Sequence, residues 1–175
     1  MSATPYPVWS EGEDAVESAR LLATFAHHGQ VDKSGRPYIE HPSVVATLAL
    51  GIGLGASRGG RDLDMGVVRQ VAWLHDVAED TRVSHAMMEA LGVPSQVRIP
   101  LMLLDRGWST RGGIADYYAR IKDHPVALIV KHADISHNMA PGRLARLDEP
   151  TRDRLRAKYA KACEALGLDF DRLAV

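Results

Sequence analysis

Four residues near the middle of the chain carry side chains that could bind a metal ion or transfer a proton. His75 and Asp76 are adjacent, and Glu79 and Asp80 each follow one of them after about one helical turn. They stand at the end of an apolar segment, residues 71–74, so we expect the four side chains to converge. Buried carboxylates without compensation are costly and repel one another, and a divalent cation would remove both costs. The alternative interpretation is a solvated helix end with acids on its surface.

Two further segments favour the metal site. His41 stands at the predicted start of one helix, and Asp134 and Asn138 lie one turn apart where another predicted helix changes from apolar to polar. Taken singly, His41 could be a loop histidine and Asp134 could pair with Lys131. Together the candidate ligands provide two imidazoles and two carboxylates, a set that suits a divalent metal with positions left for water. They are His41, His75, Asp76 and Asp134.

The elements that would position these residues are all predicted to be helices. Apolar residues recur with helical spacing in nearly every long segment, and no alternating strand pattern lasts more than a few residues. We expect a compact all-α domain of seven or eight helices over residues 1–175, with a core of about 11–167. The glycine-rich stretch 51–60 is predicted to be a connector. The expected helices are 10–28, 42–52, 64–75, 84–91, 94–106, 114–122, 125–137 and 151–166.

Composition limits the classes of partner. Of 175 residues, 46% are hydrophobic and 25% charged, and the net charge of −1 gives no electrostatic reason to expect nucleic acid or an anionic membrane. No apolar run approaches the roughly 18–20 residues that cross a bilayer. The first 13 residues lack the layout of a signal peptide, so we expect the cytoplasm. Cys163 is the only cysteine, which excludes an internal disulfide and a cysteine-based metal site.

The spacing His41, His75-Asp76, Asp134 resembles the H…HD…D pattern of the HD phosphohydrolase superfamily. A sharper resemblance is to the hydrolase domain of the Rel/Spo-type alarmone enzymes, above all its small stand-alone versions. It covers about residues 15–165. The motifs that carry it are AHHGQ at 26–30, KSGRPYIEHP at 33–42, LHDVAEDT at 74–81, and VKHAD at 130–134 followed by Asn138.

This resemblance implies a fold, a reaction and roles for individual residues. It implies the HD-domain helical fold and one manganese ion on His41, His75, Asp76 and Asp134. Glu79 and Asp80 would position and activate a water molecule. The reaction would remove the 3′-diphosphate from guanosine tetra- or pentaphosphate and release pyrophosphate. Three residues match positions that contact the nucleotide in the family: Lys33, Asn138 and Tyr159.

Asp32 is a departure from the family pattern. The family usually has an arginine here, lying against the purine, and an aspartate cannot stack in that way. Asp32 could instead accept hydrogen bonds from the base, and guanine offers two such donors to a carboxylate where adenine offers one amino group. We therefore expect a guanine preference that depends on Asp32. Residues 135–137 also differ from the arginine- and leucine-bearing stretch common in the family.

Three other interpretations remain. The same chemistry could act on another phosphorylated nucleotide: an adenosine alarmone, a dinucleotide cofactor phosphate such as NADPH, or a nucleoside monophosphate. The chain could be a regulator that binds metal or nucleotide without turnover, although Glu79 and Asp80 argue against a pure binder. It could also be a structural helical domain with incidental acids. In each of the first two the partner is a small phosphorylated nucleotide, and the sequence leaves the oligomeric state open.

Overall fold

A computed structural model describes residues 6–7, 9–10, 12–33, 35–109 and 112–173 of the chain, and these residues form helices and loops. Within the described ranges the only β-pairing is an isolated bridge between Val31 and Pro37. None of the described helices is long and apolar enough to cross a membrane. The predicted all-α fold is therefore confirmed, while the boundary expected at residue 11 lies outside the described residues.

Eight of the described helices have six or more residues, in agreement with the seven or eight predicted. They are α1 (Ala15–Ala26), α2 (Glu40–Arg58), α3 (Met65–Leu74), α5 (His85–Ala90), α6 (Ser95–Leu104), α8 (Ile114–Asp123), α9 (Pro125–Met139) and α11 (Glu149–Leu166). Three four-residue helices are α4 (Val77–Asp80), α7 (Arg106–Ser109) and α10 (Pro141–Leu144), and 3₁₀ turns are η1 (Gly12–Asp14) and η3 (Phe170–Arg172).

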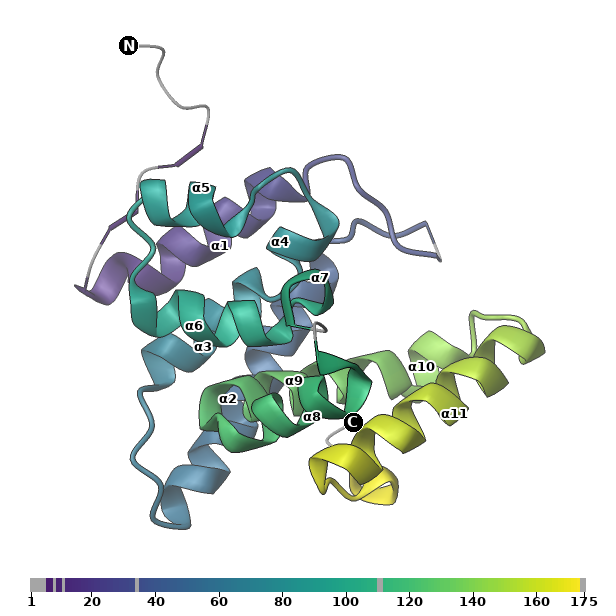
Figure 1. Cartoon of the computed structure of the whole chain (residues 1–175). Helices are drawn as coiled ribbons and strands as arrows, with labels where there is room; N and C mark the ends of the chain where they lie inside the picture. Colours follow the sequence, from purple (N-terminus) through teal and green to yellow (C-terminus); the bar gives the residue numbers. More distant parts are fainter. Residues whose placement is uncertain (1–5, 8, 11, 34, 110–111, 174–175) are drawn as a thin grey trace.

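Helix α3 lies at the centre of the molecule. It packs against α1, α2, α6 and α9, and α9 in turn contacts α2, α8 and α11 (Figure 1). The apolar side chains that these helices share form one core, which includes the fully buried Leu74 and Val130. Leu74 directly precedes His75, and Val130 directly precedes Lys131, which contacts Asp134. The core therefore fixes the two helices that carry the candidate ligands His75 and Asp134.

Helix α2 is longer than the sequence predicts. The stretch 51–60 was expected to be a connector, but it is helical as far as Arg58. Gly53 explains the helix, because a Cβ atom built there would lie 2.9 Å from Sδ of Met65 and 3.8 Å from Cγ1 of Val68. The missing side chain lets α2 approach α3 closely, and the packing obtained outweighs the low helix propensity of glycine.

Helix α3 ends within one residue of its predicted end, with His75 as its last, capping residue. Asp64 caps its start as expected, accepting hydrogen bonds from the backbone nitrogens of Gly66 and Val67 at 2.8 and 3.1 Å. At its end, Nδ1 of His75 lies 2.8 Å from the carbonyl oxygen of Ala72. In a continuous helix that carbonyl would accept from the amide of Asp76. The imidazole takes this place, and α3 stops at Leu74 before α4 begins at Val77.

Candidate active site

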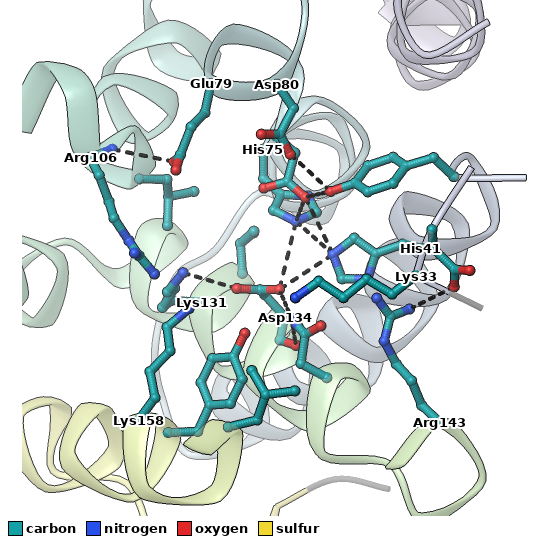
Figure 2. Close-up of a pocket in the computed structure, with 18 of the residues that line it drawn as sticks. Lys33, His41, His75, Glu79, Asp80, Arg106, Lys131, Asp134, Arg143 and Lys158 are labelled. Atoms are coloured by element: carbon teal, nitrogen blue, oxygen red, sulfur yellow. Dashed lines mark hydrogen bonds and ion pairs between the residues drawn. The ribbon is translucent and has the colours of Figure 1, made fainter. Parts of the chain in front are cut away.

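The predicted ligands meet at one point between α2, the α3–α4 junction and α9 (Figure 2). Nε2 of His41 lies 3.3 Å from Nε2 of His75, 3.3 Å from Oδ1 of Asp134 and 3.4 Å from Oδ2 of Asp76. Nε2 of His75 lies 3.1 Å from Oδ2 of Asp76 and 3.9 Å from Oδ1 of Asp134. Two imidazoles thus face two carboxylates, and three of the four residues are buried: His41, His75 and Asp134.

Each imidazole is oriented by a bond on its far side. Because a carbonyl oxygen only accepts, the contact between His75 and Ala72 places a proton on Nδ1 and turns Nε2 toward the cluster. His41 points its Nδ1 at Nδ1 of His137, 2.7 Å away, with the two rings stacked. Burial, and then the charges of His41 and Arg143, lower the pKa of His137 to about 4, so His137 is neutral. The Nε2 atoms of both rings thus face the cluster, where they can bind a cation once they have lost their protons.

Asp134 is held by two donors from its own helix. Lys131, one turn earlier, donates to Oδ2 at 2.9 Å, and Nδ2 of Asn138 donates to Oδ1 at 2.6 Å. Burial alone would raise the pKa of Asp134, but the charge of Lys131 and the neighbouring imidazoles hold it well below its usual range. Asp134 is thus an oriented carboxylate that stays ionised, which is the form that binds a metal.

The cluster has the chemistry and spacing of a cation site. Donor atoms on one ion at bond lengths of about 2.0–2.2 Å stand about 3.0–3.5 Å apart, close to the 3.1–3.9 Å found here. Within the described part of the chain, His41, His75 and Asp134 offer ligand atoms that all lie within 4.8 Å of one another. Asp76 completes the set through its contacts with both imidazoles. The residues therefore fit a divalent metal with mixed nitrogen and oxygen ligands.

Glu79 and Asp80 lie at the edge of the cluster rather than in it. The hydroxyl of Tyr38 joins Asp80 to the ligands, with its oxygen 2.6 Å from Oδ2 of Asp76 and 3.1 Å from Oδ2 of Asp80. Glu79 lies on the other side of α4, where it accepts a hydrogen bond of 3.4 Å from the backbone nitrogen of Arg106. Burial raises the pKa of Glu79, although the contact with Arg106 works in the opposite direction. Both acids are exposed, so water can reach them.

A cavity of about 460 Å³ lies over the cluster. Basic side chains flank it on two sides: Arg106, Lys131 and Lys158 on one, and Lys33 and Arg143 on the other (Figure 2). Burial and the nearby cations Arg106 and Lys131 lower the pKa of Lys158. A ring of cations around a candidate metal site is the arrangement expected for a ligand that carries several phosphate charges.

The four predicted substrate residues all line this cavity. Lys33 is exposed at its mouth, and Tyr159 is buried in its wall with Nζ of Lys158 4.8 Å from the centre of its ring. Asn138 also contacts Asp134, so it supports a candidate metal ligand as well as the cavity wall. Oδ1 of Asp32 accepts from the backbone nitrogen of Arg36 at 3.1 Å, and its Oδ2 lies 3.6 Å from Nη1 of Arg143. Ser34 of the motif lies outside the described residues.

Several residues of the site were given no role from the sequence. Tyr38 lies inside the quoted motif at 33–42, two residues before Glu40-His41-Pro42, and the motif drew attention only to His41. His137 was noted as a departure, and its contact with His41 spans 96 positions. Arg143 follows a Pro-Gly pair that predicts a helix end and nothing more. Such contacts join distant segments, so local patterns carry no signal for them.

Comparisons with known proteins show similarity in sequence over part of the chain and in fold over most of it. No family model matches the chain. It is 38% identical over 82 residues to the bifunctional (p)ppGpp synthase/hydrolase SpoT of Escherichia coli K12, and equally to a guanosine-3′,5′-bis(diphosphate) 3′-pyrophosphohydrolase of Escherichia coli O157:H7. Each match covers 45% of this chain and 10% of the relative, so the chain spans about a tenth of the length of these proteins.

A solved structure shares the fold over nearly the whole chain. It is that of a metazoan ortholog of SpoT that hydrolyses ppGpp, and it superimposes with a TM-score of 0.67 over 90% of this chain and 88% of that one, at 23% identity. The expected HD-type helical fold is thereby confirmed. The chain resembles the Rel/Spo-type hydrolase domain in both sequence and fold.

Proposed function

We propose that this chain is a metal-dependent phosphohydrolase that removes the 3′-diphosphate from guanosine tetra- or pentaphosphate. The single observation that carries the proposal is the cluster of His41, His75, Asp76 and Asp134 with Asp80 at its edge, joined to it by Tyr38. The likeness to proteins with ppGpp hydrolase activity supports the choice of substrate. Manganese as the ion and the cytoplasm as the location are part of the proposal.

The residues of the site divide the work of hydrolysis among them. A divalent cation on the four ligands would make a water molecule more acidic and offset negative charge on the phosphate. Asp80, exposed beside the ligands, is placed to accept the proton that the attacking water loses. The hydroxyl of Tyr38 donates to Asp76 and Asp80, and so fixes the orientation of the Asp80 carboxylate.

The cations around the cavity neutralise the phosphates. Arg106 and Lys158 stand on the side of the cluster where Lys131 is already engaged by Asp134. Charged donors of this kind stabilise charge that develops on a phosphoryl group in the transition state. Glu79, which accepts a hydrogen bond from the backbone nitrogen of Arg106, would help Asp80 to position the attacking water.

The test is a substrate panel with product analysis. The purified chain would be incubated with manganese and guanosine tetraphosphate, and the products would be separated into pyrophosphate and orthophosphate. Release of pyrophosphate with guanosine diphosphate is the expected result. Adenosine tetraphosphate, NADPH and nucleoside monophosphates would run in parallel. Faster turnover of one of these would replace the guanosine alarmone as substrate, and binding without turnover across the panel would favour a regulator.

A further inference from the structure

A hydrogen-bonded pair of nearly buried side chains stands next in the chain to Arg106. Nε2 of His85, at the start of α5, lies 2.9 Å from Oδ2 of Asp105, the residue between α6 and α7. The two side chains are 11% and 12% exposed. Neither residue lines the cavity over the metal cluster, whereas Arg106, the first residue of α7, does. The pair is therefore one residue away from the site without belonging to it.

Asp105 caps the short helix α7. The backbone of Asp105 is extended, which ends α6, and its Oδ1 accepts from the backbone nitrogen of Trp108 at 3.2 Å. This is the hydrogen bond that an aspartate makes when it precedes a helix. A Cβ atom built at Gly107 would lie 3.2 Å from the same oxygen, so the carboxylate lies close over the first turn of α7. One oxygen of Asp105 thus holds α7, and the other faces His85.

His85 fixes the orientation of that carboxylate. Because an ionised carboxylate only accepts, Nε2 of His85 is the donor. Nδ1 of His85 is buried and has no hydrogen-bond partner among the residues that the structure describes, so Asp105 is the polar contact that orients the imidazole. The ring of Trp108 packs edge-on against this imidazole, with the ring centres 5.6 Å apart. His85 therefore supports α7 in two ways, through Asp105 and through Trp108.

Helix α7 needs this support because it has only four residues. A helix of that length has almost no hydrogen bonds of its own, so its position depends on the contacts that it makes with the rest of the molecule. It carries Arg106, whose side chain extends toward Lys131 and whose backbone nitrogen donates to Glu79 at 3.4 Å (Figure 2). The benefit of a cation in phosphoryl transfer depends on where it stands, and a displacement of about 1 Å can cost a factor of about 100 in rate.

We propose that Asp105 and His85 are positioning residues for Arg106: they hold α7 in the place from which the guanidinium group reaches the phosphates of the substrate. This inference rests on the proposed function, because it takes Arg106 to bind the diphosphate that is released. It assigns a task in the reaction to two residues that lie outside the cavity.

A double-mutant cycle tests whether His85 acts through Arg106. His85→Ala should lower kcat/KM for guanosine tetraphosphate by about tenfold, which is part of the loss expected when a donor to the transition state is removed outright. In the Arg106→Ala background the same change should cost less than about twofold, because a side chain that is absent cannot be misplaced. Asp105→Ala should show the same dependence on Arg106.

Two amide replacements of His85 distinguish the hydrogen bond from the bulk of the ring. Glutamine can place its amide nitrogen near the position of Nε2, whereas asparagine can place it only near that of Nδ1. His85→Gln should therefore keep kcat/KM within about threefold of the parent protein, and His85→Asn should resemble His85→Ala. If His85→Ala does not fold, His85→Asn takes its place in the cycle.

Ser84→Ala is the matched control. Ser84 directly precedes His85 and caps α5, where its hydroxyl oxygen accepts from the backbone nitrogen of Met87 at 3.2 Å. Loss of the cap should lower the melting temperature but change kcat/KM by less than about twofold, because the bond between His85 and Asp105 remains. The control separates a loss of stability in this region from a loss of positioning.

An unchanged kcat/KM in His85→Ala, or equal losses with and without Arg106, would overturn the inference, because the pair would then act independently of that arginine. A loss in Ser84→Ala as large as that in His85→Ala would overturn it too. Failure of the proposed function is a separate result, in which the unmodified protein releases no pyrophosphate from guanosine tetraphosphate. The same cycle is then measured by calorimetric titration of the manganese-loaded protein with inorganic pyrophosphate, where His85→Ala should weaken binding only while Arg106 is present.

Discussion

The hydroxyl group of Tyr38 lies between two acids that have different tasks in the proposed mechanism. The hydroxyl oxygen lies 2.6 Å from Oδ2 of Asp76 and 3.1 Å from Oδ2 of Asp80, and its one proton can be donated to either carboxylate. Without this shared donor the two carboxylates would repel each other. Burial, and then the charge of Asp76, raise the pKa of Tyr38, so the hydroxyl remains a donor at every working pH. Tyr38 therefore links the ligand shell to the residue that is placed to take the proton.

We expect Asp80→Asn to lower the turnover number by about a hundredfold or more, the usual scale for loss of a general base, while metal content stays unchanged. The reason is that the carboxylate of Asp80 is linked to the cluster through the hydroxyl of Tyr38 and does not itself belong to the ligand set. Steady-state kinetics and metal analysis of the same preparation provide the measurement. Loss of the metal in this variant would make Asp80 a ligand and contradict the division of roles.

Tyr38→Phe is the comparison variant for Asp80→Asn. It keeps the ring that packs edge-on against His41 but removes the hydroxyl that directs both acids. Its turnover should lie between the parent protein and Asp80→Asn, because the base remains but is no longer oriented.

His75→Ala and Asp134→Ala should each abolish both metal binding and activity. Either change removes one of the converging donors, and the second also leaves Lys131 buried without its carboxylate partner. We therefore expect Asp134→Ala to lower the melting temperature more than His75→Ala. Metal analysis and thermal denaturation test this, with His132→Ala as a control on the same helix but outside the cavity. If both variants still bound manganese in a stoichiometric amount, the assignment of His75 and Asp134 as metal ligands would be wrong.

At the scale of the elements, the junction between α3 and α4 shows what the sequence could and could not predict. The residue types at 75, 76, 79 and 80 were sufficient to expect a convergence, because apolar periodicity stops there. The break itself follows from the contact of His75 with the Ala72 carbonyl, which depends on the rotamer of one side chain. Helix α4 is a consequence of that contact, and no periodic pattern over four residues could reveal it.

The close contact of α2 with α3 makes a second testable point. Gly53→Leu should destabilise the protein by about 1–3 kcal/mol, because the new side chain would meet Met65 and Val68 in a packed interface. Gly51→Leu is the matched control, since nothing lies within 4 Å of a Cβ atom at Gly51. It should stabilise the helix by roughly 0.5–1 kcal/mol through propensity. Urea unfolding measures the free energy of unfolding of both variants. Equal changes would show that the close contact at Gly53 does not limit how near α2 packs to α3.

For the whole molecule, the parts that could be predicted are those with a local cause. Helix number and most helix starts follow from periodicity and caps such as Asp64 and Ser84, and the candidate metal ligands follow from residue type and spacing. The extended α2 and the shell around the ligands required three-dimensional packing. The bonds of His41 with His137 and of Asp32 with Arg143 depend on how α2, α9 and α10 meet, and that arrangement is set by the core.

The core also brings two histidines and two carboxylates together, and the negative charge of the carboxylates must be offset by protons on the imidazoles or by a cation. They are His41, His75, Asp76 and Asp134. Burial by itself would lower the pKa of His41, but Asp134 and Asp76 outweigh it and raise this pKa to about 9. The pKa of buried His75 is raised in the same way, mainly by the charge of Asp76 acting against burial. Without a cation, protons on the imidazoles therefore offset the carboxylates, and a metal must displace those protons when it binds.

This competition predicts opposite pH responses with and without metal. In the metal-free protein the raised pKa of His41 contributes stability that is complete below the unfolded value of about 6.5 and is lost as the pH rises through about 9. Stability measured in a chelator should thus fall by about 1–3 kcal/mol between pH 6.5 and 9.5. Manganese should stabilise more at pH 8.5 than at pH 6, because fewer protons compete for the two Nε2 atoms. Urea unfolding across this range, with and without the metal, tests both, and stability in chelator that rises toward pH 9 would show that the imidazoles are neutral in the metal-free fold.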